Sequence, residues 1–130
     1  TVEIGDYISN DERVKLCKEA GKVAEVYPEH HNYFGVDIIP MVNDSVDRYF
    51  YGATPNEGET ELKLIRRQHI ETSMIGVRTA KKLFKEWGPT QLLGNMNVYS
   101  AWEPYAKVAQ INRIKFNIFR IVDIKVIPNS

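Results

Sequence analysis

Residues 60–87 read TELKLIRRQHIETSMIGVRTAKKLFKEW, and the predicted fold depends on how this stretch is divided. At its start, apolar residues alternate with charged ones, as they do on a half-buried strand, so we predict a strand over 60–66. From Glu71 onward the apolar residues recur every three or four positions, which is typical of a helix. Gly88, followed by proline, is a common helix stop. The stretch is therefore predicted to change from strand to helix.

Two more strands are predicted before this stretch. Over 33–41 the period is two, with Phe34, Val36 and Ile38 on one side and Ile39 and Met41 on the other. Over 46–53, Arg48 and Phe50 alternate with Tyr49 and Tyr51, and turn-forming residues follow each segment. Strands that are joined by short turns pair antiparallel. Together with the strand over 60–66, they predict a three-strand antiparallel meander.

The rest of the chain predicts two or three helices around this sheet. Ser9 and Glu12 have the spacing of a capping box, which marks the start of a helix. The other predicted elements are a helix over 11–26, a strand over 92–99, a helix with Pro104 in its first turn and a bulged strand over 114–127. We therefore expect residues 1–130 to form a single α+β domain with a mixed, mostly antiparallel sheet.

The formal net charge of zero hides an uneven distribution along the chain. Residues 1–61 carry 13 acidic and 5 basic side chains, whereas residues 62–130 carry 4 acidic and 12 basic ones. The two halves either neutralise each other within the fold or form surfaces of opposite sign. Such surfaces would favour an anionic ligand or a head-to-tail contact between copies in a homo-oligomer. The acidic half disfavours binding to a nucleic-acid backbone.

Several classes of protein are excluded by signals that the sequence lacks. No apolar run approaches the roughly 20 residues needed to cross a bilayer, so we expect no membrane partner. The first residues form no leader, and the single cysteine, Cys17, cannot form an internal disulfide, so a cytoplasmic location is expected. His30 and His31 are adjacent, and no His or Cys pair has the spacing of a metal site, so we expect no metal. Phosphate-loop, dinucleotide and serine-hydrolase motifs are absent.

The order of the predicted elements, a meander followed by helix, strand, helix and strand, resembles that of the GNAT family of acyl-CoA-dependent N-acyltransferases. That family carries Gln or Arg, two residues, Gly, one residue and then Gly or Ala where its long helix starts, and backbone N–H groups there bind a pyrophosphate. Residues 68–73, QHIETS, occupy the corresponding place. Gln68 matches the motif, Ser73 is small, and Glu71 replaces the central glycine. The resemblance therefore implies a GNAT-like fold with a degenerate coenzyme motif.

The resemblance also implies a cofactor and a set of site residues. Acetyl-CoA would be held by Arg66, Arg67, Gln68, Ser73 and Arg78. Asp37 or Glu61 would relay a proton from the amine substrate. Tyr105 or Tyr99 could take the place of the general-acid tyrosine of the family, or no residue serves in that role.

A second function remains open from the sequence. It is a non-enzymatic protein-binding or assembly domain, since degenerate relatives of the family occur among phage proteins. Such a domain would self-associate through its oppositely charged surfaces or through the strand over 114–127. Four cations, Arg78, Lys81, Lys82 and Lys85, recur at helical spacing. They form either a solvated helix face or a contact for a phosphate or an acidic partner.

Overall fold

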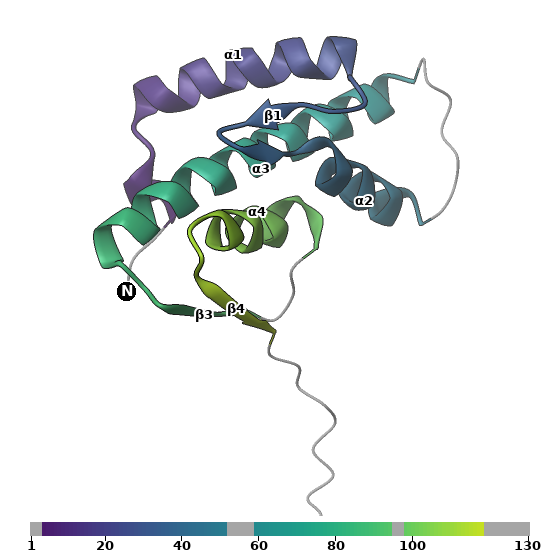
Figure 1. Ribbon diagram of the computed structural model, residues 1–130. Coiled ribbons are helices and arrows are strands. Elements are labelled where there is room, and N and C mark those ends of the chain that lie inside the picture. Colours follow the sequence, from purple (N-terminus) through teal and green to yellow (C-terminus); the bar gives the residue numbers. More distant parts are fainter. Residues whose placement is uncertain (1–3, 52–58, 95–97, 119–130) are drawn as a thin grey trace, which may run out of the picture.

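A long helix, α3 (Thr60–Trp87), lies at the centre of the fold, and the other helices pack against it (Figure 1). The computed structural model describes residues 4–51, 59–94 and 98–118. The remaining elements are η1 (Ile4–Tyr7), α1 (Asn10–Val26), β1 (Asn32–Tyr33), β2 (Val36–Asp37), α2 (Ile39–Phe50), β3 (Gln91–Gly94), α4 (Tyr99–Ile111) and β4 (Lys115–Ile118).

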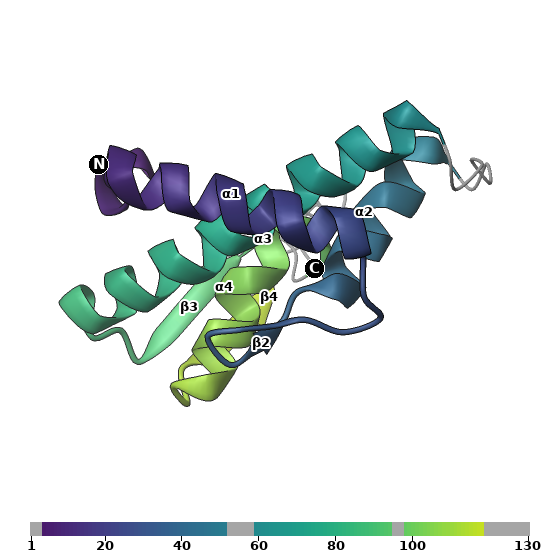
Figure 2. The ribbon, with the colours of Figure 1, turned by 90° about the horizontal axis from the view of Figure 1, so that it is seen from above.

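The helices lie on two sides of α3. Helix α1 runs in the opposite direction to α3 along one side, as both views show (Figures 1 and 2). Helices α2 and α4 pack against α3 and against each other on the other side. The β3–β4 pair lies next to α4, away from α1 (Figure 1). Apolar residues of all four of these helices form the buried core.

The predicted three-strand meander is wrong, and with it the α+β sheet. In the described part of the chain the structure is mostly helical, with two small sheets of two strands each. Of the segment predicted as a strand over 46–53, residues 46–50 belong to α2, because Ile39, Val42 and Val46 recur at helical spacing and are buried together. Residues 52 and 53 lie outside the described residues. The segment over 33–41 contributes only a short hairpin before α2 begins.

The strand predicted over 60–66 is the beginning of α3. Leu62 and Leu64 suggested a two-residue period, but Leu64 is 52% exposed while Leu62 and Ile65 are buried. Leu62 and Ile65 are three residues apart, and further along α3 the buried residues Ile70, Met74 and Val77 follow one another at four and three, as they do on one face of a helix. Residues 60–87 consequently form one uninterrupted helix.

The predicted helix ends are confirmed where local capping signals exist. The Ser9 hydroxyl accepts a 3.2 Å hydrogen bond from the Glu12 N–H at the start of α1. Gly88 ends α3 in a left-handed conformation, with φ of 54°. Helix α4, in contrast, begins at Tyr99, so Pro104 lies inside it and not in its first turn.

The second sheet is a short parallel pair. Leu92 pairs with Phe116, and the Phe116 ring lies over Gly94, where an added Cβ atom would be 2.6 Å from the ring. Of the strand predicted over 92–99, residues 92–94 belong to β3, residues 95–97 lie outside the described residues, and Tyr99 is the first residue of α4. Of the strand predicted over 114–127, residues 115–118 form β4, and residues 119–127 lie outside the described residues.

Candidate functional site

Glu12 on α1 is the centre of a half-buried ion network. Its carboxylate lies 2.7 Å from Lys82 Nζ and accepts a 3.0 Å hydrogen bond from Arg78 Nη1. Arg78 Nε also donates to the Tyr33 hydroxyl at 2.8 Å, and Lys82 donates to the Tyr7 carbonyl at 2.9 Å. The hydrogen bond from Lys82 is the main reason why the pKa of Glu12 is lowered. The network joins η1, α1 and the β1–β2 hairpin to α3.

This network divides the row of four cations on α3. Arg78, which was predicted to bind the coenzyme, and Lys82 are both used to hold α1. Lys81 and Lys85 are exposed and form no ion pair with any residue that the structure describes. Only these two lysines of the row are therefore open to a ligand or partner.

The segment predicted to bind the pyrophosphate lies in the middle of α3. Inside a helix each backbone N–H donates to the carbonyl four residues earlier, so these groups are already used. The Ser73 side chain is buried and donates to the His69 carbonyl at 2.8 Å, and the Gln68 carbonyl accepts from the Thr72 hydroxyl at 2.9 Å. Residues 68–73 thus lack the free helix N-terminus on which the family's motif depends.

The two arginines before this segment point to different surroundings. The Arg66 guanidinium lies 4.0 Å from the centre of the Tyr27 ring, a cation–π contact between α3 and the end of α1. Arg67 lies 3.3 Å from the Glu71 carboxylate one turn later, and its guanidinium covers Gly21 of α1. Of these two predicted coenzyme ligands, Arg67 therefore borders an open groove between α1 and α3.

Asp37, one of the predicted catalytic acids, has a structural role in the turn before α2. Its Oδ1 atom accepts hydrogen bonds from the backbone N–H groups of His31 and Ile39, at 3.1 and 3.2 Å. Its Oδ2 atom is 2.7 Å from Nδ1 of His30. Burial raises the pKa of Asp37, but these hydrogen bonds outweigh burial, so that the pKa is lowered overall.

The other two predicted catalytic residues lie on different helices. Glu61, in the first turn of α3, accepts a 3.2 Å hydrogen bond from the Tyr49 hydroxyl of α2. The Tyr105 hydroxyl on α4 is buried without a hydrogen-bond partner in the described structure, and burial raises its pKa. No hydrogen bond links any two of Asp37, Glu61 and Tyr105, all of which the structure describes. The structure therefore does not join them into a catalytic group.

A groove between α1 and the first half of α3 gathers positive charge. We call Lys18 and Lys22 of α1, together with Lys63 and Arg67 of α3, the basic groove; it has a volume of about 560 Å³. Glu25 is the one acidic residue that lines it, and Leu64 contributes an exposed apolar side chain. Within the described chain, none of the three lysines forms an ion pair. The groove therefore presents a net positive charge beside an apolar surface.

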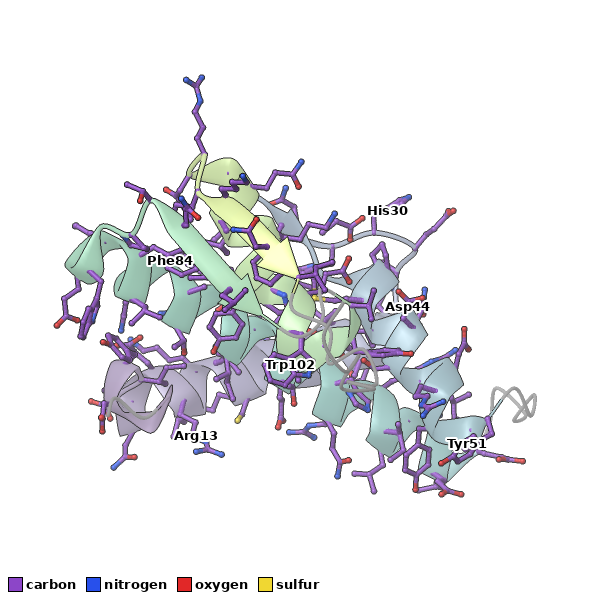
Figure 3. All side chains as sticks on the ribbon, turned by 90° about the horizontal axis from the view of Figure 1, so that it is seen from below. Arg13, His30, Asp44, Tyr51, Phe84 and Trp102 are labelled. Carbon is purple, nitrogen blue, oxygen red and sulfur yellow. The ribbon has the colours of Figure 1, made fainter. Side chains whose placement is uncertain are left out.

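A surface of opposite sign follows α2. We call Asp44 and Asp47 of α2, with Glu103 of α4, the acidic face. The two aspartates border a hollow of about 600 Å³ that also contains Arg48 and the exposed rings of this region. Figure 3 shows Asp44 and Tyr51 on α2, away from α1, where Arg13 points outward. Burial and the charge of Asp44 raise the pKa of Glu103, against the opposing effect of Lys107.

The chain was compared with family models, curated proteins and solved structures. No family model, curated protein or solved structure matches the chain. In the part of the chain that the structure describes, no helix is long and apolar enough to cross a membrane. The same residues include no group of His, Cys, Asp and Glu that could hold a metal ion.

The lysines of the basic groove were missed by reasoning from the sequence. Lys18 and Lys22 are one helical turn apart on α1, which was a usable signal for a shared face. Lys63, however, was assigned to a strand, so it could not be placed opposite them. The groove forms because the first turns of α3 are helical and α3 packs along α1, which brings Lys63 opposite Lys18 and Lys22.

Proposed function

We propose that this protein is a non-enzymatic assembly domain in which the basic groove of one copy binds the acidic face of another. The single observation that supports this proposal best is the basic groove, where three lysines without ion pairs and Arg67 surround exposed Leu64. Charge of this density attracts an acidic surface, and the apolar contact stabilises the complex once it has formed.

The acidic face supplies a complementary surface on the same chain. Asp44 and Asp47 lie beside Tyr51, whose side chain is 84% exposed. Tyrosine is enriched in protein interfaces because it offers a large contact area at low entropic cost. Acidic side chains with an aromatic ring are thus a suitable partner for lysines around a leucine.

The two surfaces lie on different sides of α3, so they do not neutralise each other within one copy. Lys63 and Arg67 border α1, whereas Asp44 and Asp47 lie on α2, which packs on the other side of α3 (Figure 1). A contact between two different surfaces is heterologous, and it leaves one groove and one acidic face free at the ends of every open oligomer. Assembly of this kind produces rings or chains rather than two-fold symmetric dimers.

The test uses two double charge reversals that each disable one surface. We expect the groove variant Lys22→Glu/Lys63→Glu and the face variant Asp44→Lys/Asp47→Lys to be monomeric alone in light scattering. Mixed together they should form a 1:1 heterodimer, because the groove variant retains an acidic face and the face variant retains a groove. The wild-type oligomer and the heterodimer should both dissociate at high salt, because the Debye length falls from about 10 Å at 0.1 M to about 3 Å at 1 M.

A control variant separates site-specific effects from net charge. Arg13→Glu/Lys15→Glu changes the charge by the same amount on exposed positions of α1 outside the groove, and it should assemble like the wild type. A mixture that stays monomeric, or wild-type protein that is monomeric at low salt, would show that the proposal is wrong.

N-acyl transfer from acetyl-CoA stays a prediction that a thermal-shift measurement tests. A ligand at 100 times its dissociation constant stabilises the folded state by about 2.7 kcal/mol. We expect no shift at millimolar acetyl-CoA, because the N–H groups of residues 68–73 are inside α3. A reproducible shift that is lost in Arg67→Ala would instead favour the enzyme.

A further inference from the structure

Phe34, at the tip of the β1–β2 hairpin, has a backbone conformation that is unfavourable for phenylalanine. Tyr33 pairs with Val36, so Phe34 and Gly35 form a two-residue turn in which both residues have positive φ, 49° and 88°. Turns of this kind prefer Asn-Gly, because a bulky side chain is disfavoured in the left-handed region. Asn32 supports the turn by accepting a 2.9 Å hydrogen bond from the Gly35 N–H.

This strained residue is also exposed beside two cations. The Phe34 side chain is 50% exposed, and its ring centre lies 5.1 Å from Lys81 Nζ and 5.2 Å from Arg78 Cζ. Burial of the ring therefore does not explain why a phenylalanine occupies this position. Strained residues that persist at the surface are concentrated at binding sites.

Phe34 forms one wall of a cleft between the end of α3 and the end of α4. The cleft has a volume of about 440 Å³, within the range of about 300–1,000 Å³ that is typical of sites for small molecules. Its apolar walls include Phe84 of α3 and Ile111 of α4, and Ile111 is 55% exposed. Lys81 and Lys85 line the same cleft, and neither has an acidic partner in the described structure.

We propose that this cleft binds a small carboxylate with an apolar body, of the class of medium-chain fatty acids. Phe34, Phe84 and Ile111 would cover the chain, while Lys81 and Lys85 would hold the carboxylate. The size of the cleft limits the ligand to a small molecule. The lysines favour an anion, and the apolar walls favour an anion that also carries an apolar group. This site is separate from the basic groove, and the proposal does not depend on self-assembly.

The experiment measures binding of decanoate, decanol and decylamine to the full chain by titration calorimetry. Nuclear magnetic resonance locates the site through amide shifts. We expect decanoate to bind most tightly and to shift residues 34, 81–89 and 108–114. Decanol should bind at least about tenfold more weakly, because it lacks the charge that the lysines recognise. Equal binding of decanol and decanoate would overturn the proposal.

Two variants test the residues that carry the argument. Lys85→Gln and Phe34→Asn should each weaken decanoate binding by about tenfold, and Phe34→Asn should stay folded because asparagine tolerates positive φ. Lys15→Gln, an exposed lysine of α1 outside the cleft, should bind as the wild type does. Unchanged affinity in both cleft variants would overturn the proposal. Sedimentation with anionic vesicles but no binding of free decanoate would overturn it as well, and would indicate a membrane-contact surface.

Discussion

The Glu12 carboxylate and the Lys82 ammonium group are 70 residues apart in the chain and 2.7 Å apart in the fold. This contact joins the first turn of α1 to the last third of α3. Because Lys82 also donates to the Tyr7 carbonyl, the same lysine holds η1 in place. Arg78 and Lys82 of the cationic row on α3 therefore hold α1, whereas Lys81 and Lys85 form no ion pair in the described structure.

The Glu12 contact predicts a specific response to acid. The pKa of Glu12 is lowered in the folded state, so its stabilisation is complete above its ordinary value of 4.5 and is lost as the pH falls through the folded value. Glu12→Gln should therefore lower the melting temperature at pH 7 and have a smaller effect near pH 3. Melting curves across this range test the prediction, and a difference that does not change with pH would contradict it.

His30 predicts a response of the opposite sign. Its hydrogen bond with Asp37 raises the pKa of His30 above the ordinary value of 6.5. The stabilisation is therefore complete below 6.5 and is lost as the pH rises through the folded value. Between about pH 5.5 and pH 8.5 the wild type should lose more stability than His30→Gln. Chemical denaturation at both pH values measures this difference, and parallel losses in the two proteins would refute the assignment.

Substitution by alanine should change the free energy of unfolding in opposite directions at two glycines that lie within helices. At Gly76 an added Cβ would lie 2.9 Å from Cβ of Pro104, a rigid ring buried inside α4. Overpacking costs about 1–3 kcal/mol, which exceeds the helix-propensity gain of about 1 kcal/mol, so Gly76→Ala should destabilise the protein. At Gly21 the nearest atom, Cζ of Arg67, is 3.6 Å away, so Gly21→Ala should stabilise it. Denaturant unfolding of both variants tests the prediction, which fails if the two changes have the same sign.

The two buried serines between α2 and α4, Ser45 and Ser100, should contribute unequally to the free energy of unfolding. The Ser45 hydroxyl accepts a 2.8 Å hydrogen bond from the Ser100 backbone N–H and lies 2.8 Å from the Ser100 hydroxyl. Ser45→Ala leaves that N–H unsatisfied in the core, at a cost of about 1–3 kcal/mol. Ser100→Ala keeps the backbone bond and should lower the free energy of unfolding less. A larger loss in Ser100→Ala would contradict this interpretation.

The parts of the fold that could be predicted were those with local signals. Helix α1 was predicted because the Ser9 hydroxyl can accept a hydrogen bond from the Glu12 N–H within one turn, and the end of α3 because Gly88 adopts positive φ without strain. Residues 46–50 were misread because the alternation of Arg48 and Phe50 with Tyr49 and Tyr51 resembles a strand, whereas the buried positions of α2 have helical spacing.

The candidate site was predicted less well than the helices. Arg67, Lys81 and Lys85 were singled out from the sequence, and they border the groove or the cleft. Arg78 and Asp37 were also singled out, but their partners are other residues of the fold. Sequence spacing shows which side chains share a face of one helix, and it does not show which other element satisfies their charges.

By itself, the sequence determined the N-terminal cap of α1, the C-terminal cap of α3 and the uneven distribution of charge, because the caps depend on residues close together in the chain and the charges can be counted along it. Only the tertiary structure decided whether residues 60–66 are a strand or a helix. Leu62 and Leu64 have the spacing of one strand face, and Leu62 and Ile65 have the spacing of one helix face. Packing against α1 and α2 buries Leu62 and Ile65 together and leaves Leu64 at the surface. The free energy of that burial selects the helix, and the helix in turn brings Lys63 opposite the lysines of α1.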